Sequence, residues 1–301
     1  MLHHDAVRRN QQYRIRQIKE VGDIVNTGGD VSIVIEPPKG LFRLNLRETW
    51  HYRELLYFLA WRDLKTRYAQ TAIGIGWAIV QPLFTMLMFT LVFSRMANIP
   101  SDGLPYSVFA LTALLPWGYM ARSLERCSTS VVNEGALVRK VYFPRLIIPL
   151  AASVIGLVDF SVAFLFLLAM MAWYHIVPTW GILLLPMFLG LALLTALSVS
   201  LWLSATNVKY RDVASMVPLA TQLWMFASPV VYPLSLVPDQ WKFLYSLNPM
   251  VGVIEGFRWA LLGNTRPDFD AMMLSAAVVF ALFVGGVIYF RSVEDTFSDV
   301  I

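Results

Sequence analysis

The sequence has a single cysteine and few charged residues for its length. Cys127 is the only cysteine among 301 residues, so the chain cannot form an internal disulfide. Charged residues make up 15% of the chain, whereas soluble domains carry about 25%. Hydrophobic residues make up 57%, and the mean hydropathy is +0.58. Most of the chain is therefore expected to contact lipid or other apolar helices.

The common sequence motifs of catalysis are also missing. There is no GxxxxGK[ST] phosphate-binding loop, so the chain cannot bind ATP by that route. There is no HExxH, CxxC or GxSxG motif, and the four histidines show no metal-ligand spacing. The formal net charge of +4 is too small to indicate a nucleic-acid partner. The sequence thus predicts neither an enzyme nor a metal or cofactor site in this chain.

Long stretches without charge predict an all-α integral membrane protein. From Ile73 to Ser94 no charge occurs for about twenty residues, enough to cross a hydrocarbon core of roughly 30 Å. Similar runs predict six transmembrane helices, at about 73–95, from 106 onward, and at 146–174, 182–205, 213–232 and 272–290. Cations mark the cytoplasmic loops, and those between the crossings are Arg139, Lys140, Arg145, Lys209 and Arg211. Both termini are therefore predicted to be cytoplasmic.

An amphipathic interface helix is predicted over 47–70, between a cytoplasmic tail (1–46) and the transmembrane domain (71–301). Aromatic residues at helical spacing alternate there with cations: the aromatics are Tyr57, Trp61 and Tyr68, and the cations are Arg62, Lys65 and Arg67. Such a segment suits the boundary between lipid headgroups and water. The alternative is an ordinary surface helix of a soluble domain, but the apolar run that follows directly favours the membrane.

One carboxylate, Asp159, lies in the middle of the third predicted crossing. A charge at this depth is costly and usually faces a bundle interior or a watery path. Two interpretations stay open: a group in a channel or relay, or a buried hydrogen-bond partner of a neighbouring helix. In the second crossing, Arg122, Glu125 and Arg126 follow at three- and four-residue spacing and are expected to pair along one helix side.

The apolar segment 236–265 is interrupted by four charged residues. Neither half is long enough to cross the membrane. The sequence instead predicts two short helices, joined at Asn248 and Pro249, that dip into the outer leaflet.

Several stretches together resemble a known family. They read WRDLKTRYAQTAIGIGWAIVQPL, NEGALVRKVYFPRLIIPLA, NVKYRDV, SPVVYPLSLVP with LNPM, and the terminal FSDVI. In this order the chain resembles, over about residues 45–301, the membrane subunit of bacterial ABC exporters for O-antigen, capsule and teichoic-acid chains. The resemblance implies a homodimer with a channel on its two-fold axis, in the cytoplasmic membrane. It also implies two copies of a separate ATPase subunit, which binds ATP and Mg, and a lipid-linked polysaccharide as substrate.

The resemblance further implies roles for three segments. Residues 134–142 match the cytoplasmic coupling helix that contacts the ATPase, 47–68 match the interface helix, and 236–262 match a pair of short outer gate helices. The coupling contacts are expected at Glu134, Arg139, Lys140 and Tyr142.

Aromatic side chains are candidates for the wall of the channel. The apolar C–H faces of sugars pack on Trp and Tyr rings, and such contacts are not tied to one hydroxyl pattern, so a glycan can slide. The candidates, together with Asp159, are Trp77, Trp117, Tyr119, Trp224, Phe226 and Tyr232. The alternative for each of them is ordinary packing or contact with lipid.

Three cations near the predicted inner headgroup level are candidates for substrate loading. Arg62, Lys65 and Arg67 lie within six residues of one another. A guanidinium can hold phosphate oxygens bidentately, so these cations are expected to attract the pyrophosphate of a lipid-linked glycan. The alternative is that they bind only anionic membrane lipids.

Two other protein classes compete with a polysaccharide exporter. An ABC permease for drugs or lipids would share the six crossings but would not need an aromatic channel. A membrane-embedded transferase would need clustered carboxylates or histidines at the membrane edge, and the isolated Asp159 does not supply such a cluster.

Overall fold

The computed structural model describes residues 50–69, 71, 74–141, 143–263 and 268–297. The predicted tail (1–46) and Tyr142 lie outside these residues. The described residues belong to one unit, Leu41–Ile301, and form helices joined by turns, with no strand among them. This confirms the prediction of an all-α protein.

Five of the helical segments are long. They are α4 (Trp77–Phe89) with its π-helical extension η2 (Thr90–Met96), α5 (Tyr106–Asn133), α7 (Ile147–Trp173), α8 (Leu185–Lys209) after the short η3 (Trp180–Leu184), and α12 (Phe269–Glu294). Within the described part of the chain, four segments are long and apolar enough to cross a membrane: Gly74–Met96, Ile147–Trp173, Trp180–Lys209 and Phe269–Glu294. They agree with four of the six predicted crossings.

The other two predicted crossings form helices of a different kind. The helix α5 has 28 residues but carries Arg122, Glu125 and Arg126 along its length. The helix α9 (Val213–Phe226) has 14 residues and is shorter than the predicted 213–232. It ends before Pro229, because proline lacks a backbone donor and disfavours the helical conformation in the residue before it.

The centre of the structure is α5, which packs against α4, α7, α8, α9 and α11 (Pro249–Leu262). Between membrane helices van der Waals packing replaces the hydrophobic driving force, and small residues let backbones approach. Gly156 of α7 shows this, since a Cβ there would lie 2.9 Å from Ser123 Oγ and 3.0 Å from Tyr119 Cε2, both on α5. The close contact between α5 and α7 positions Asp159 three residues further along α7.

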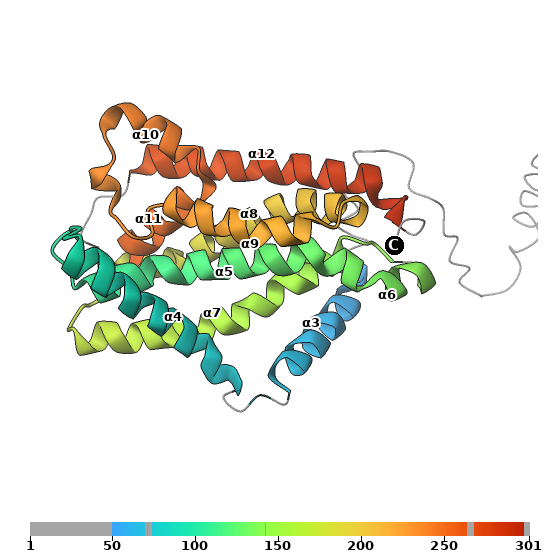
Figure 1. Cartoon of the computed structure of the whole chain (residues 1–301), viewed down its shortest axis with the longest axis horizontal. Coiled ribbons are helices and arrows are strands. Elements are labelled where there is room, and N and C mark those ends of the chain that lie inside the picture. Colours follow the sequence, from blue (N-terminus) through green and yellow to red (C-terminus); the bar gives the residue numbers. More distant parts are fainter. Residues whose placement is uncertain (1–49, 70, 72–73, 142, 264–267, 298–301) are drawn as a thin grey trace, which may run out of the picture. The chain divides into compact units, whose positions relative to one another are not determined.

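Different short helices lie at the two ends of α5 (Figure 1). At one end α5 leads into α6 (Gly135–Lys140). At the other end lie α10 (Asp239–Ser246) and α11, where the Tyr106 hydroxyl donates to the carbonyl of Val231 at 2.8 Å. With a rise of 1.5 Å per residue, the 28 residues of α5 separate these ends by about 42 Å.

The helix α3 (Arg53–Tyr68) covers the described part of the predicted interface helix and packs on α7. Its aliphatic residues face the protein: Leu59 is buried, with Leu55 and Leu56 beside it. Tyr57 and Trp61 stack on each other on the exposed side, with ring centroids 6.5 Å apart. The helix α3 thus places aliphatic side chains against the protein, and exposed aromatic rings beside exposed charged residues such as Lys65 on its outer side.

The described part of the segment 236–265, which is 236–263, contains the predicted pair of short helices, α10 and α11. Asn248 caps α11, since its side chain accepts a hydrogen bond from the Met250 amide at 3.0 Å, and Pro249 occupies the first turn. Gly263 ends α11 in the left-handed conformation, with φ of 66°.

Candidate functional site

The carboxylate of Asp159 is the centre of a polar cluster between α3, α5 and α7. Asp159 is 1% exposed and accepts a hydrogen bond from the Tyr68 hydroxyl. Arg67 Nη1 lies 2.6 Å from Asp159 Oδ2, as an ion pair without hydrogen-bond alignment, and Arg126 Nη2 lies 4.0 Å from the same oxygen. Asp159 therefore bonds to a neighbouring helix, one of its two predicted interpretations, and it also lines a cavity.

Tyr68 keeps its proton in this cluster. Burial, and next the hydrogen bond to Asp159, raise the pKa of Tyr68 from 10.0 to about 12. Its hydroxyl is therefore a donor to the carboxylate at neutral pH, which holds the end of α3 against α7.

Three cavities lie along the polar cluster, and each shares lining residues with the next. The first and the second are each about 200 Å³ and share Arg67. The third, of about 210 Å³, shares Gln81 and Arg122 with the second. Asp159 lines the second cavity, and Arg126 lines the first. The cavities thus connect α3 with the interior of the bundle along the arginine-bearing side of α5.

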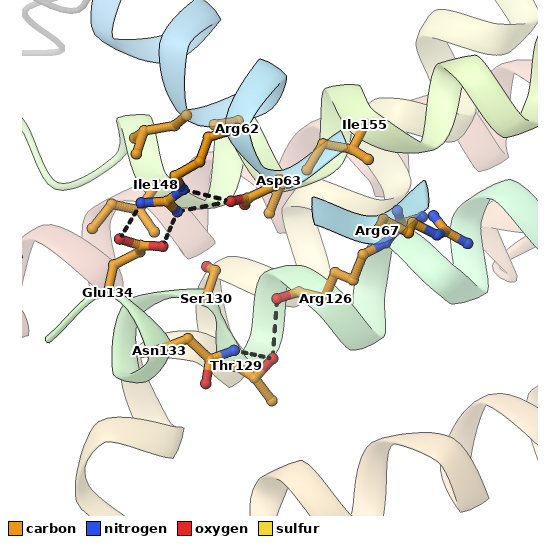
Figure 2. A pocket seen from close by; sticks show the side chains of 13 residues that line it. Arg62, Asp63, Arg67, Arg126, Thr129, Ser130, Asn133, Glu134, Ile148 and Ile155 are labelled. Carbon is orange, nitrogen blue, oxygen red and sulfur yellow. Dashed lines mark hydrogen bonds and ion pairs between the residues drawn. The ribbon is translucent and has the colours of Figure 1, made fainter. Parts of the chain in front are cut away.

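Arg62 and Glu134 were predicted to serve two different functions, yet they bind each other. Arg62 Nη1 donates to Glu134 Oε2 at 3.2 Å, Nη2 donates to the other carboxylate oxygen, and the same guanidinium also contacts Asp63 (Figure 2). The hydrogen bond that Arg62 donates to Glu134 is the main reason why the pKa of Arg62 is raised. This ion pair joins α3 to the residue that precedes α6.

Among the other predicted cations, Arg67 pairs with Asp159, whereas Lys65, Arg139 and Lys140 make no ion pair with the described residues. Lys65 is exposed on α3, and Arg139 and Lys140 are exposed at the end of α6. Tyr142, the last predicted coupling residue, lies outside the described residues. A short helix that ends in two exposed cations can contact a soluble partner without rearrangement of the bundle.

The predicted aromatic residues lie in three kinds of environment. Trp77 is half exposed in the second cavity, and Phe226 is exposed at the end of α9. Trp117 is buried, lines the third cavity and meets Trp224 edge to face at 5.9 Å. The remaining two make hydrogen bonds: the hydroxyl of Tyr119 donates to the Ser153 carbonyl at 3.3 Å, and that of Tyr232 pairs with the Tyr245 hydroxyl at 2.8 Å.

Trp224 also fixes the start of α11. Its Nε1 donates to Asn248 Oδ1 at 2.9 Å, and the Asn248 amide donates to the Ala227 carbonyl at 3.0 Å. These bonds tie the end of α9 to the junction between α10 and α11. Within the described chain, Trp117, Tyr119, Trp224 and Tyr232 therefore have packing or hydrogen-bonding roles.

A buried ion pair in α11 was not singled out from the sequence. Arg258 Nη1 lies 3.2 Å from Glu255 Oε1, and the guanidinium also donates to the carbonyls of Val230 and Tyr232 at 3.1 and 3.4 Å. Its Cζ lies 3.7 Å from the centroid of the Phe109 ring on α5. The available signal was the three-residue spacing of opposite charges in an otherwise apolar segment.

Comparison with known proteins gives the family. The model of the ABC-2 type transporter family matches residues 54–262. The chain is 31% identical over 260 residues to the O-antigen export system permease protein RfbA of Myxococcus xanthus, covering 85% of this chain and 98% of the relative. It is 24% identical to RfbA of Klebsiella pneumoniae, over 82% of this chain and 95% of the relative. It is 22% identical to the polysialic acid transport protein KpsM of Escherichia coli, over 76% and 89%. The chain belongs to the ABC-2 type transporter family.

Proposed function

We propose that this chain is the permease subunit of an ATP-driven exporter that moves a lipid-linked, O-antigen-like polysaccharide across the cytoplasmic (inner) membrane. The similarity to an O-antigen export permease over 98% of that relative carries the proposal. The long apolar helices supply the membrane domain. The row of cavities from α3 into the bundle supplies a polar region beside the interface helix.

In the proposed topology the chain crosses the membrane six times, with both termini in the cytoplasm. The crossings are α4 with η2, α5, α7, α8, α9 and α12, and α10 and α11 are the outer gate helices. The cations that follow α5 and α8 support this orientation, and they are Arg139, Lys140, Arg145, Lys209 and Arg211. The position of α10 and α11 at the opposite end of α5 is consistent with an outer gate (Figure 1).

The proposed transporter is a homodimer with two copies of a separate ATPase subunit. A two-fold interface makes one channel from two identical halves. ATP and Mg bind to the ATPase subunit, because this chain has no phosphate-binding loop. Glu134, Arg139, Lys140 and Tyr142 form the coupling contact, and the exposure of Arg139 and Lys140 supports this role.

The proposed substrate path uses cations first and aromatics next. Arg62, Lys65 and Arg67 attract the pyrophosphate of the lipid-linked glycan at the cytoplasmic headgroup level. The channel wall includes Asp159 and the predicted aromatics, of which Trp77 and Phe226 present exposed rings. The other four are Trp117, Tyr119, Trp224 and Tyr232, and they support the wall from inside the protomer.

The proposed function is tested by reconstitution with the cognate ATPase. The purified chain alone should hydrolyse no ATP, and the complex in proteoliposomes should hydrolyse ATP faster when a lipid-linked O-polysaccharide is added. Stimulation by drugs or phospholipids but not by the glycan would indicate a different ABC permease. Glycosyl or acyl transfer by the isolated chain would indicate a membrane-embedded transferase. Either result would overturn the proposal.

A further inference from the structure

Arg126 is a largely buried cation whose terminal nitrogens lack a hydrogen-bond partner. Its Nε donates to the carbonyl of Arg122 at 3.0 Å, which holds the side chain along α5. Nη1 and Nη2 are both buried, and no described residue accepts a hydrogen bond from them. A buried donor without an acceptor is unfavourable, and more so when it is charged. The two terminal nitrogens of Arg126 can therefore donate hydrogen bonds to an anion.

The charged residues around Arg126 also carry more positive than negative charge. Arg67 and Arg126 both face the carboxylate of Asp159, at 2.6 and 4.0 Å, and Arg122 lines the same cavity as Asp159. Three positive charges around one carboxylate leave a net charge of +2. Glu125 of α5 lines the third cavity together with Arg122. With Glu125 counted as well, the three arginines keep a net charge of +1, so the cluster is complementary to an anionic group.

The acids of the first cavity do not neutralise the cluster. Asp63 and Glu134 line this cavity, but both are bound to Arg62. Figure 2 shows the guanidinium groups of Arg67 and Arg126 together on the other side of the cavity, away from that ion pair. Arg62 and its two acids together carry one net negative charge, whereas Arg67 and Arg126 share the single carboxylate of Asp159.

The same cavity has an apolar wall. Its apolar lining residues are Leu59, Ile148, Ala151, Ala152 and Ile155. Its volume of about 200 Å³ is many times the roughly 10–15 Å³ that one water molecule requires. A ligand with an anionic end and a hydrocarbon segment could therefore place both parts against suitable surfaces.

We propose that Arg67, Arg122 and Arg126 form a binding site for the phosphate group of a lipid. In the absence of the lipid, Asp159 is the counter-ion of these arginines, and the phosphate displaces it. Arginine suits this role because its planar fork binds two phosphate oxygens at once. The identity of the lipid as a glycan carrier rests on the proposed function. The site shares Arg67 with the proposed entry cations and adds Arg122 and Arg126 of α5, whereas Arg62, which is paired with Glu134, is not part of it.

Binding of farnesyl diphosphate, a short prenyl diphosphate, tests the site. The full chain with its ATPase, without nucleotide, would be placed in nanodiscs of neutral phosphatidylcholine for titration. Arg122→Gln and Arg126→Gln should each weaken binding about tenfold or more, because each removes charge-assisted hydrogen bonds. Arg95→Gln, which removes an exposed arginine of η2, is the matched control and should bind as the wild type does. Unchanged binding in both α5 variants would overturn the proposal.

Asp159→Asn separates a ligand site from a purely structural cluster. If Asp159 competes with the phosphate, its neutralisation should tighten farnesyl diphosphate binding about tenfold, and the ligand should raise the thermal unfolding midpoint more than in the wild type. If the cluster is purely structural, Asp159→Asn should instead lower the stability and weaken farnesyl diphosphate binding. That outcome would overturn the proposal. If Asp159→Asn does not fold, farnesyl diphosphate binding by Arg122→Gln and Arg126→Gln decides whether the site exists.

The source of the phosphate is tested with two further probes. Inorganic pyrophosphate should bind at least tenfold more weakly than farnesyl diphosphate, because it cannot use the apolar wall. Equal binding of the two would overturn the assignment to a lipid. Phosphatidic acid added to the nanodiscs should compete with farnesyl diphosphate in the wild type; a lack of competition would overturn the site as a general lipid-phosphate site.

Failure of this site and failure of the proposed function give different results. A complex whose ATPase is stimulated by the lipid-linked glycan, and whose arginine variants bind farnesyl diphosphate normally, would refute only the site. A complex that binds farnesyl diphosphate through Arg126 but shows no response to the glycan would refute only the polysaccharide assignment.

Discussion

An arginine with little solvent exposure lies at each end of α5, and the two arginines differ in their partners. Arg258 lies beside the first turn of α5 and contacts Glu255, two backbone carbonyls and the Phe109 ring. Arg126 lies near the last turns of α5, beside a cavity, and its terminal nitrogens make no hydrogen bond to the described residues. Both terminal nitrogens of Arg258 have acceptors inside the protein, whereas neither terminal nitrogen of Arg126 has one among the described residues.

This difference separates a structural charge from a charge available to a ligand. A buried ion pair with excellent geometry can hold its surroundings in one arrangement, although its net contribution to stability is often small. At Arg258 those surroundings are the segment after α9 and the helix α11. At Arg126 the missing partners coincide with a cavity and an excess of positive charge. The end of α5 near Arg258 is therefore expected to respond to mutation through stability, and the end near Arg126 through binding.

Removal of Arg258 should have the largest effect on stability. Arg258→Gln leaves the carboxylate of Glu255 buried without its cation, which should lower the free energy of unfolding by about 3–5 kcal/mol. Thermal unfolding in detergent, followed by intrinsic fluorescence, measures this. The double variant Glu255→Gln/Arg258→Gln should recover part of the loss, because it removes both charges.

Lys242→Gln in α10 is the control for Arg258. Lys242 lies 2.7 Å from Asp239, but this pair is exposed to solvent. Screened surface pairs contribute little, so we expect no measurable change in the unfolding midpoint. If Arg258→Gln unfolds at the same temperature as Lys242→Gln, Arg258 is not structural and the comparison between the two ends of α5 fails.

Much of the fold was predictable from the sequence, because membrane crossing depends on local composition. The charge-free runs gave four apolar spans with nearly the observed bounds. The junction at Asn248 and Pro249 was also local, since a capping residue followed by proline starts a helix. The end of α9 at Phe226 was harder, because the apolar sequence continues to Tyr232 while Pro229 interrupts the helix.

The partners of the charged residues were much harder to predict. Tyr68 and Asp159 are 91 residues apart, and Arg62 and Glu134 are 72 apart. Both contacts depend on the docking of α3 against α7 and the end of α5, which hydrophobic periodicity does not specify. The sequence identified Asp159, Arg62 and Glu134 as important but could not show that each has a partner within the chain.

Charge reversal in α6 should affect assembly rather than stability. Arg139→Glu/Lys140→Glu places two acids at the exposed end of α6, where the ATPase is proposed to bind. We expect association with the ATPase to weaken tenfold or more through loss of charge complementarity, with little change in the unfolding midpoint of the isolated chain. Co-purification and titration of the two subunits measure this. Normal assembly of the double variant would show that the ATPase contacts another surface.

The Tyr68 hydroxyl should make a smaller contribution to stability. Tyr68→Phe removes the hydrogen bond to Asp159, which should cost about 1 kcal/mol at neutral pH. The pKa of Tyr68 is raised to about 12 in the folded protein, so the stabilisation is complete below its ordinary pKa of about 10. It is then lost as the pH rises from about 10 to 12. Unfolding midpoints across this range should fall less steeply in Tyr68→Phe than in the wild type. Parallel curves would show that Tyr68 does not bond to Asp159.

The ion pair between Arg62 and Glu134 should contribute least, because 40% of the Arg62 side chain is exposed. Such a partly exposed pair is screened, and a double-mutant cycle with Arg62→Gln and Glu134→Gln should give a coupling energy of about 0.2–1 kcal/mol. The charge swap Arg62→Glu/Glu134→Arg then distinguishes two functions of Glu134. If Glu134 acts by joining α3 to α6, the swap should restore the coupled ATPase activity that either single reversal lowers. If Glu134 contacts the ATPase instead, the swapped protein should remain as impaired as the Glu134→Arg variant.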